Sequence, residues 1–422
     1  MCAARLGLPR LDGTGGFLVA LLIDALGTGF FTPISLLYFH TVAGLPLPAI
    51  GLALTVATVL TLPLTPLTGA LVDRLGARWL VIASHLLQAA GFLGYLGVGT
   101  VPALLGTALL VTAGARVFYA AAAALVAEIA VPGEQDRWYG LVGATQSIGL
   151  GAGALLAGLV VGVGRAQGYR VLIVANALSF LLAAALVRWS LKTPQPVWAA
   201  TTPARQGYRT VLADRPFLGL LLANVVFALC AQVLGLALPV YATEALGAPL
   251  WVVGAAFALN TGLIVGTQTV VVQLLEPYRR TRTLVGAGLV WTVANGLFAL
   301  AVAVPQAVLV PYLFAVVVLY TGGVVLYAPT LTALAAACAP ERLRGRYLAA
   351  YEFSWGVSAA LAPALFTLLY ARSPALPWLV VGVLVLLAVV LVAWLEPRLP
   401  AQAVRLSSAD RSAHNAPAPE HP

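Results

Sequence analysis

The chain has 422 residues, of which 61% are hydrophobic and only 9% are charged, and its formal net charge at pH 7 is +9. Soluble domains average about 25% charged residues, so this composition excludes a soluble globular protein and indicates that lipid surrounds most of the chain. The positive balance does not indicate nucleic-acid binding, because most of the Lys and Arg residues gather in loops on one side of the predicted helices.

Twelve apolar segments are long enough to cross the ~30 Å hydrocarbon core of a bilayer as helices. In the first half of the chain they cover residues 17–39, 48–71, 79–99, 103–128, 139–162 and 169–190. In the second half they cover residues 216–241, 249–275, 283–304, 307–338, 346–370 and 376–395. The sequence therefore predicts an all-α membrane protein with 12 transmembrane helices.

The longest polar interruption between these segments divides them into two groups of six. We predict an N-terminal six-helix bundle over residues 1–190, a cytoplasmic linker over 191–215, a C-terminal six-helix bundle over 216–396 and a disordered cytoplasmic tail over 397–422. The tail is rich in Ala, Pro, Ser and charged residues, which do not supply enough apolar surface for a packed core.

The positions of the basic residues predict the orientation in the membrane. Only Arg165, Arg170 and Arg372 lie in loops on the side away from the two termini. The side of a membrane with the excess of Lys and Arg is the cytoplasmic side. We therefore expect a multi-pass protein of the cell (inner) membrane with both termini in the cytoplasm.

Two loops of the first half have counterparts in the second half. The segment PGEQDRWYG precedes the fifth span and PERLRGRY precedes the eleventh, and each has an arginine just before the span, Arg137 and Arg344. The loop 69–78 has a degenerate counterpart at 276–282. This repeat predicts two parallel halves related by an axis along the membrane normal, a common organisation of secondary transporters.

Asp24 is an acidic residue inside the first predicted span, with no cation within seven positions on either side. A charged Asp near the middle of a membrane helix costs about 2.5–3.5 kcal/mol, so protonation or a partner must offset that cost. Such a residue is suited to carrying a proton across the membrane. The structural alternative is a hydrogen bond between helices. We interpret His40 and His85 as helix-end or packed histidines.

Three segments carry a family resemblance. The loop GALVDRLGAR at 69–78 resembles the G-x-L-x-D-R-x-G-x-[RK] signature of the major facilitator superfamily. LGTGFFTP at 26–33 resembles the first-span signature of its twelve-span drug:proton antiporters. GLGAGALLAG at 149–158 resembles their fifth-span motif G-x-x-x-G-P-x-x-G-G, with Ala154 in place of the proline. The resemblance implies two six-helix bundles that rock around a central cavity.

The resemblance also implies roles for residues at the cytoplasmic face. In this family the loop carboxylate, here Asp73, faces the start of the eleventh helix, and Arg78 is placed to reach Glu128. We expect such residues to hold one conformation rather than to bind substrate. The predicted conformational gate consists of Gly69, Asp73, Arg74, Gly76, Arg78, Glu128, Arg137 and Arg344.

Arg116 lies in the middle of the fourth span, where the resemblance places the family's fourth-helix arginine at the cavity. Arg keeps its charge in lipid, so it needs an acceptor, and Asp24 is the predicted partner. We expect Asp24 and Arg116 to couple transport to protons, with protonation of Asp24 releasing Arg116. Glu352 in the eleventh span is a candidate second protonation site, or alternatively an interface pair with Arg346 or Arg344.

Polar and aromatic residues of the spans are expected to line the cavity, including those that share a helical face with Asp24. The predicted substrate-cavity residues are Thr28, Phe31, Ser35, Tyr119, Asn224, Gln232, Asn260, Gln268, Tyr320 and Tyr327. The alternative is that they bridge membrane helices, which polar groups do at about 0.6 kcal/mol each without any transport role.

The sequence contains no Walker A motif, no metal-ligand spacing and no nucleophile motif. It predicts a protein that is not an enzyme and uses no cofactor or metal, and we expect a monomer that handles protons and a small-molecule substrate. The expected function is proton-coupled efflux of small lipophilic or amphipathic compounds by alternating access. A facilitator or proton symporter for a small metabolite is one alternative, and a non-transporting membrane sensor or membrane-embedded enzyme is another.

Overall fold

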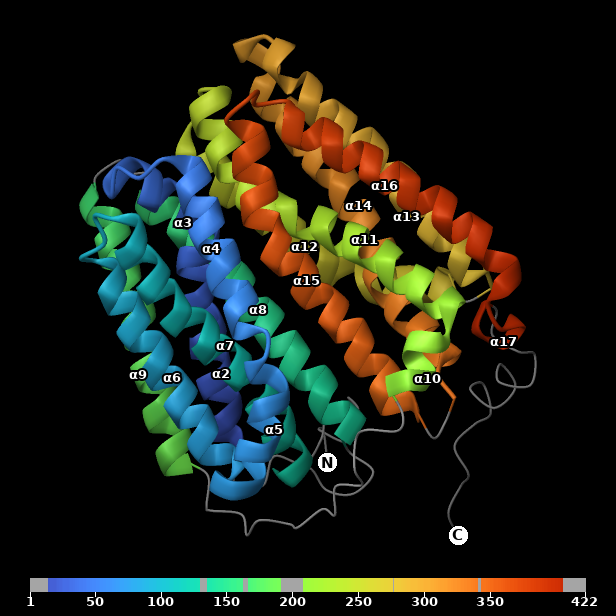
Figure 1. Cartoon of the computed structure of the whole chain (residues 1–422). Helices are drawn as coiled ribbons and strands as arrows, with labels where there is room; N and C mark the ends of the chain where they lie inside the picture. Colours follow the sequence, from blue (N-terminus) through green and yellow to red (C-terminus); the bar gives the residue numbers. More distant parts are fainter. Residues whose placement is uncertain are drawn as a thin grey trace, which may run out of the picture.

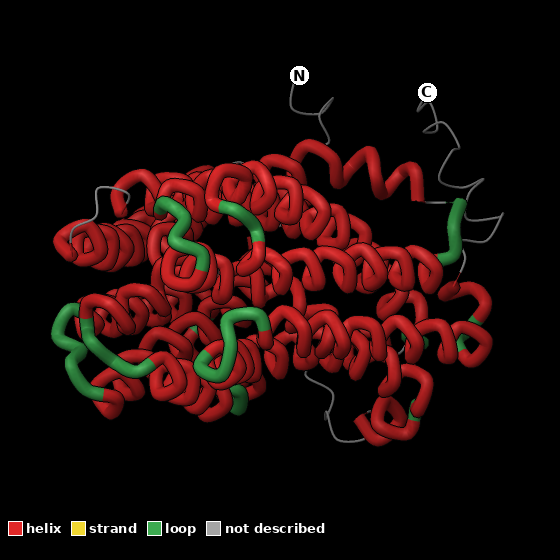
Figure 2. The backbone as a smooth tube through the Cα atoms, turned by 90° about the horizontal axis from the view of Figure 1, so that it is seen from above, coloured by secondary structure: helices red, strands yellow, loops and turns green. Residues whose placement is uncertain are grey.

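The computed structural model describes residues 14–129, 135–161, 166–190, 208–275, 277–340 and 343–404, which form helices and no strand (Figure 2). The first half contains α2 (Gly15–Phe31), η1 (Thr32–Ile34), α3 (Ser35–Leu37), η2 (Tyr38–Val42), α4 (Leu47–Thr61), α5 (Leu64–Leu75), α6 (Ala77–Tyr95), α7 (Val101–Ile129), α8 (Gln135–Val161) and α9 (Ala166–Ser190). The second half contains α10 (Tyr208–Ala213), α11 (Arg215–Val240), η3 (Tyr241–Ala245), α12 (Leu250–Leu275), α13 (Arg280–Leu300), η4 (Ala301–Ala303), α14 (Gln306–Cys338), α15 (Arg344–Tyr370), α16 (Leu376–Leu395), η6 (Glu396–Arg398) and α17 (Ala401–Val404).

Eight helices of the described ranges are long and apolar enough to cross a membrane, and α2 with the bent segment after it makes up to nine. The chain bends by 47° after α2, at a 3-10 turn that contains Pro33. The predicted second span is also interrupted, so that α4 and α5 are separate helices on either side of Pro63. Proline explains both breaks, because it lacks the N–H that an uninterrupted helix uses.

The helices pair in the same way in both halves of the chain, which pack as two bundles (Figure 1). α2 contacts α8 and α9, and α11 makes the equivalent contacts with α15 and α16. α6 contacts α7 and α9, as α13 contacts α14 and α16. The bundles meet along α4–α15 and along α8–α12. These pairings follow a pseudo-two-fold axis, since α4 corresponds to α12 and α8 to α15.

A tyrosine clasp repeats in the two bundles. The Tyr38 hydroxyl donates a hydrogen bond of 2.9 Å to the carbonyl oxygen of Tyr95, and the Tyr241 hydroxyl donates one of 2.6 Å to that of Phe298. Both bonds join residues that are 57 positions apart. The two clasps therefore mark equivalent places in the halves, and both belong to a shared pattern, Tyr-x5-Gly-x-Pro-Leu, at residues 38–47 and 241–250.

Two polar contacts between the bundles lie in the part of the molecule remote from both termini. The Thr55 hydroxyl of α4 donates to the carbonyl oxygen of Ala360 at 2.6 Å and accepts from the N–H of Ala364 at 3.2 Å. On the two π-helical turns, Nε2 of His40 lies 3.9 Å from Oε1 of Glu244. Because α4 begins and α15 ends on this side, the contacts join the bundles opposite to the marked termini in Figure 1.

Ordered structure extends beyond two predicted boundaries. α10 lies in the predicted linker, η6 runs from the end of the predicted bundle into the predicted disordered tail, and α17 lies in that tail. Leu399, Ala403 and Val404 are buried, and α17 contacts α13 and α14. These few apolar residues cover the ends of neighbouring helices, which the mean composition of the tail does not reveal. The predicted linker from 191 to 207 and the tail from 405 to 422 lie outside the described residues.

α2 and α8 pack backbone to backbone at Gly153. A Cβ atom added to Gly153 would lie 2.1 Å from the carbonyl oxygen of Leu26 and 2.9 Å from Cα of Gly29. Backbone atoms cannot rotate away from such an overlap, so the helices must separate. We expect Gly153→Ala to lower the melting temperature of the purified protein by at least about 3 °C, as measured by intrinsic fluorescence in detergent.

Gly143 on the same helix is the matched control, since a Cβ atom added there meets nothing within 4 Å. Gly143→Ala is expected to leave the melting temperature unchanged or slightly higher, because Ala favours a helix over Gly by about 1 kcal/mol. Equal melting temperatures of Gly153→Ala and Gly143→Ala would argue against the close approach of α2 and α8.

Candidate functional site

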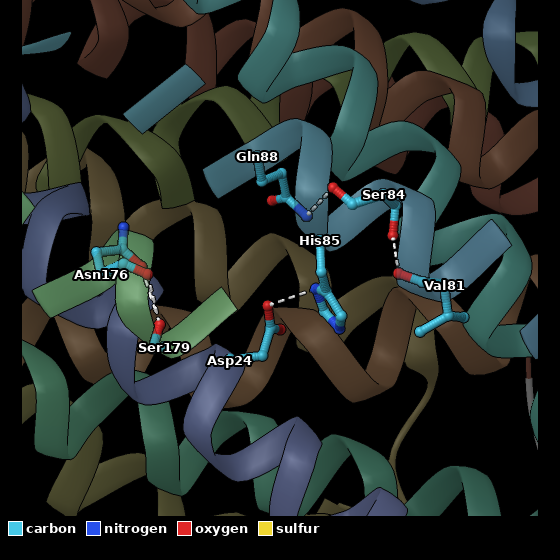
Figure 3. Close-up of polar contacts among 7 residues, drawn as sticks. All are labelled: Asp24, Val81, Ser84, His85, Gln88, Asn176 and Ser179. Atoms are coloured by element: carbon cyan, nitrogen blue, oxygen red, sulfur yellow. Dashed lines mark hydrogen bonds and ion pairs between the residues drawn. The ribbon is translucent and has the colours of Figure 1, made fainter. Parts of the chain in front are cut away.

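A buried pair of ionisable residues lies inside the N-terminal bundle (Figure 3). Asp24 of α2 is 6% exposed and His85 of α6 is 1% exposed, and 3.6 Å separates Oδ1 of Asp24 from Nδ1 of His85. That distance is longer than a hydrogen bond, and Nδ1 of His85 has no hydrogen-bond partner among the described residues. A small movement is therefore enough to make or break a hydrogen bond between the imidazole and the carboxyl group.

Polar side chains of α6 and α9 surround this pair, and aromatic rings cover it. Ser84 and Ser179 donate to backbone carbonyls of their own helices. The ring centroids of Phe118 and Phe180 lie 4.9 Å and 5.9 Å from that of His85. Among the described residues, His85 is the ion-pair partner of Asp24, and its charge depends on a bound proton. A proton on the carboxyl group or on the imidazole would therefore be needed to offset the Asp24 charge.

The C-terminal bundle has an apolar contact at the equivalent place. The tyrosines of the clasp are 203 residues apart, and the same offset takes Asp24 to Phe227 and His85 to Gly288. A Cβ atom added to Gly288 would lie 3.1 Å from Cε1 of Phe227, so these two residues also meet. In both bundles a ring faces a smaller residue. The C-terminal bundle therefore packs at this level without an ionisable pair. Packing alone does not require Asp24 and His85, which supports a functional role for them.

Arg116 does not pair with Asp24, contrary to the prediction. Its Nη1 atom lies 3.2 Å from the position of a Cβ atom added to Gly356, so the guanidinium reaches α15 of the other bundle. Asp24 faces α6 instead, where it meets His85. The sequence identifies the helix that carries each charge but not the rotation of that helix about its axis. The interpretation of His85 as a packed residue agrees with its burial, but it did not include the partner, Asp24.

Two predicted site residues are exposed near Arg116 and the bundle boundary. Tyr119, three residues after Arg116, is 61% exposed, and Glu352, one turn before Gly356, is also exposed. Residues four apart share a helical face, so Glu352 lies on the side of α15 that meets the N-terminal bundle. Among the described side chains Glu352 forms no ion pair with Arg346. A charge in a membrane-spanning helix faces water or protein rather than hydrocarbon, which favours an aqueous space at this boundary.

Three predicted cavity residues form hydrogen bonds inside the C-terminal bundle. Asn224 donates to Oγ of Ser354 at 2.5 Å and accepts from the Tyr327 hydroxyl at 2.7 Å. Tyr320 donates to the carbonyl oxygen of Cys230. Asn224, Tyr320 and Tyr327 are completely buried. They join α11, α14 and α15, as the bridging alternative expects, and do not face a cavity in this structure.

The other predicted cavity residues fall into two groups. Phe31 is buried in the core of the N-terminal bundle, where its ring centroid lies 5.1 Å from that of Phe92 and 5.4 Å from that of Tyr95. Its size and apolar surface place it in the core rather than at the cavity. The half-buried residues, which stay candidates for the cavity, are Thr28, Ser35, Gln232, Asn260 and Gln268.

The signature loop forms the turn between α5 and α6. Gly76 has a φ of 82°, which favours glycine. Arg78 in the first turn of α6 donates to the carbonyl oxygen of Arg188 in the last turn of α9, a favourable place for a cation. The Glu128 carboxylate accepts a hydrogen bond from the backbone N–H of Ala77. Arg74 is exposed. The other predicted gate residues, Gly69, Asp73, Arg137 and Arg344, lie outside the residues whose surroundings the structure describes.

Glu128 gives a testable pH dependence. Burial raises the pKa of its carboxyl group, although the Ala77 N–H opposes the shift, and Glu128 lies beyond the candidate membrane span that ends at Val126. A carboxyl with a raised folded-state pKa stabilises the fold below its ordinary pKa of 4.5 and loses this contribution as the pH rises through the raised value.

Glu128→Gln keeps the acceptor for Ala77 and removes the charge. We expect it to raise the melting temperature by about 1–2 °C at pH 7 and to leave it unchanged at pH 4, as measured by scanning fluorimetry. A lower melting temperature at pH 7 would instead show that the charged carboxylate is needed, as the predicted contact with Arg78 requires.

The Major Facilitator Superfamily model matches residues 17–363 and 276–420. Multidrug resistance protein MdtH of Escherichia coli (strain SE11) is 26% identical over 380 residues, covering 87% of this chain and 90% of MdtH. MdtH of Edwardsiella ictaluri (strain 93-146) is 29% identical over 397 residues, covering 91% of this chain and 94% of MdtH.

Solved structures share the fold at low identity. A bacterial homologue of the iron transporter ferroportin, in an inward-facing state, gives a TM-score of 0.75 at 15% identity and covers 92% of this chain and 99% of its own. A D-xylose–proton symporter gives 0.71 at 16% identity and covers 93% of this chain and 100% of its own. With the family model matched over most of its length, the chain belongs to the Major Facilitator Superfamily and is a multi-pass membrane transporter, not an enzyme.

Proposed function

We propose that this transporter exports small lipophilic or amphipathic compounds across the cell (inner) membrane in exchange for protons. The observation that carries the proposal is the buried Asp24–His85 pair, whose two groups are 3.6 Å apart. A proton bound there neutralises the carboxyl group or charges the imidazole, and either event changes the attraction between α2 and α6. The names of the MdtH relatives, which are multidrug resistance proteins, support the substrate class.

The proposal takes the chain as a monomer with 12 transmembrane helices and both termini in the cytoplasm. To the eight apolar helices it adds four further spans, formed by α2 with its bent continuation, α4 with α5, α6, and α8. The N-terminal bundle covers residues 1–190 and the C-terminal bundle covers residues 216–396. This assignment places the inter-bundle contacts of Thr55 and of His40 at the outer side of the membrane.

In the proposed mechanism the bundles rock about their boundary. The contacts between Thr55 and α15 hold the outer side closed, so the described conformation opens toward the cytoplasm. Substrate enters between the bundles, where Arg116, Tyr119 and Glu352 supply charge and an aromatic ring. Arg116 in this scheme belongs to the substrate path rather than to the proton site. The signature-loop residues, with Arg78 bound at the end of α9, hold the alternative conformations.

A facilitator or proton symporter for a small metabolite is the second candidate function. It is favoured by Ala154, which stands where the fifth-span motif of the drug:proton antiporters has a proline. Proline changes the shape of a membrane helix, so its replacement alters a feature that the antiporter resemblance requires.

Transport by the purified protein in liposomes distinguishes these functions. A lipophilic fluorescent dye is placed outside vesicles that are acidic inside, and its uptake is followed with and without the pH gradient. We expect gradient-dependent uptake of the dye and a counterflow of protons, detected with an internal pH indicator. Uptake of a nucleoside or sugar that needs no gradient, or that appears only when the gradient is reversed so that the outside is acidic, without any dye uptake, would favour the second function, and no flux of any solute would contradict both.

A further inference from the structure

A cavity of about 460 Å³ lies at the end of the C-terminal bundle, on the same side of the molecule as the termini in Figure 1. It is bounded by the end of α16, by α17 and by the residue that precedes α13. Most of its wall is apolar, and the polar residues are one arginine and one glutamate. The lining residues are Arg279, Ala393, Glu396, Pro397, Leu399, Ala401 and Val404.

Positive charge exceeds negative charge around this cavity. Oε1 of Glu396 lies 2.5 Å from Nη1 of Arg279 and 3.9 Å from Nε of Arg282, and Oε2 accepts from the Thr281 hydroxyl at 2.8 Å. Arg398 is exposed close by, on the turn that follows α16. Glu396 therefore pairs with two guanidiniums, while the third, that of Arg398, donates to the carbonyl oxygen of Trp394. The Arg282 side chain is 72% exposed, so its charge is open to a further anion.

The cavity borders the surface of α16 that faces lipid. Large apolar side chains recur along one face of α16 with about half of their area exposed, namely Leu379, Val383, Leu386, Val390 and Trp394. The stripe ends at Trp394, where the Arg398 guanidinium lies 3.6 Å from the ring centroid. Ala393, which lines the cavity, is adjacent to this residue. Trp with Arg at the end of an apolar stripe is typical of the level of the lipid headgroups.

We propose that this cavity binds the phosphate-bearing headgroup of an anionic phospholipid. The phosphate lies between Arg282 and Arg398, the glycerol region occupies the apolar cavity, and the acyl chains follow the exposed stripe of α16. Guanidinium groups bind phosphate oxygens with paired hydrogen bonds, and basic pockets between helices on the cytoplasmic side suit anionic lipids. The inference does not depend on what the protein transports.

Native mass spectrometry of the full-length protein tests this inference. The detergent-purified protein is titrated with phosphatidylglycerol, with phosphatidylcholine and with inorganic phosphate. We expect one phosphatidylglycerol to bind at least about tenfold more tightly than phosphatidylcholine, and Arg282→Gln/Arg398→Gln to weaken this binding about tenfold or more. Both substituted arginines are exposed, so the variant is expected to keep the melting temperature of the unmodified chain.

The matched control is Arg209→Gln/Arg372→Gln, which removes two exposed arginines elsewhere and is expected to bind phosphatidylglycerol as the unmodified chain does. Equal binding of the two lipids, or an equal loss in both double variants, would overturn the proposal. Binding of inorganic phosphate that depends on Arg282 and Arg398, without a preference for phosphatidylglycerol, would assign the site to a free anion and overturn the lipid assignment.

Discussion

Replacing Asp24 with Asn is expected to reduce dye export driven by a pH gradient at least about tenfold. Asn has nearly the shape of Asp but neither takes up nor releases a proton, so the packing of α2 against α6 stays while the titration is lost. Dye uptake into liposomes with a pH gradient measures the effect. The dissociation constant of the dye is measured from the rise in melting temperature with added dye. It is expected to stay within about threefold, because Asp24 is buried inside one bundle.

Two further variants show whether the proton belongs to the pair. His85→Gln removes the imidazole, so export is expected to continue with a changed pH profile, since Asp24 then titrates without its partner. Glu352→Gln is the comparison, because it removes a carboxyl group of the proposed substrate path on the other bundle, and it is expected to weaken export without removing its dependence on the pH gradient. Normal export by Asp24→Asn together with loss in Glu352→Gln would move the proton site to α15.

Joining α4 to α15 by a disulfide is expected to stop transport almost completely. The Thr55 hydroxyl lies 3.2 Å from the backbone nitrogen of Ala364, so a cysteine sulfur at 55 is within reach of one at 364. In Thr55→Cys/Ala364→Cys the bond holds the bundles together on the side remote from the termini. The protein then keeps one conformation and cannot complete a cycle. Transport is measured before and after oxidation, and a reductant is expected to restore it.

The single variants Thr55→Cys and Ala364→Cys are the controls for this experiment. Each keeps the three native cysteines, of which Cys230 and Cys338 are buried, and neither single variant is expected to lose transport on oxidation. Transport that continues at the normal rate in the oxidised double variant, with the disulfide confirmed by mass spectrometry, would show that this boundary does not open during transport.

Much of the fold follows from the sequence because the bilayer restricts the choice of structure. Long apolar segments must be helices, and the basic loops and the signature loop indicate the family. The breaks at Pro33 and Pro63 are readable in retrospect, yet an apolar segment that contains a proline is not distinguished by composition from an uninterrupted span. The ordered segment up to Val404 is missed for a similar reason, since a few buried apolar residues, Leu399, Ala403 and Val404, hold it in place.

The candidate site is less predictable because it depends on helix rotation. Asp24 and Arg116 are the two conspicuous charges within the spans, and pairing them follows from charge alone. The structure directs Asp24 toward His85 and Arg116 toward Gly356, which are choices of helical face. The repeated clasp of Tyr38 and Tyr241 contains a usable signal. With the offset of 203 residues, Asp24 aligns with Phe227 and His85 aligns with Gly288 in the sequence. Both residues therefore depart from the repeat.

The contact between Phe227 and Gly288 shows that the two halves differ chemically at this level, since Asp24 and His85 occupy the equivalent positions of the N-terminal half. In the proposed mechanism a proton acts at this level in the N-terminal half only, because Phe227 and Gly288 carry no ionisable group. In that mechanism the packing of the C-terminal half stays constant at this level while the N-terminal half responds to the proton. The proposed transport cycle therefore depends on one titratable pair at this level, although the helices around it occur in both halves.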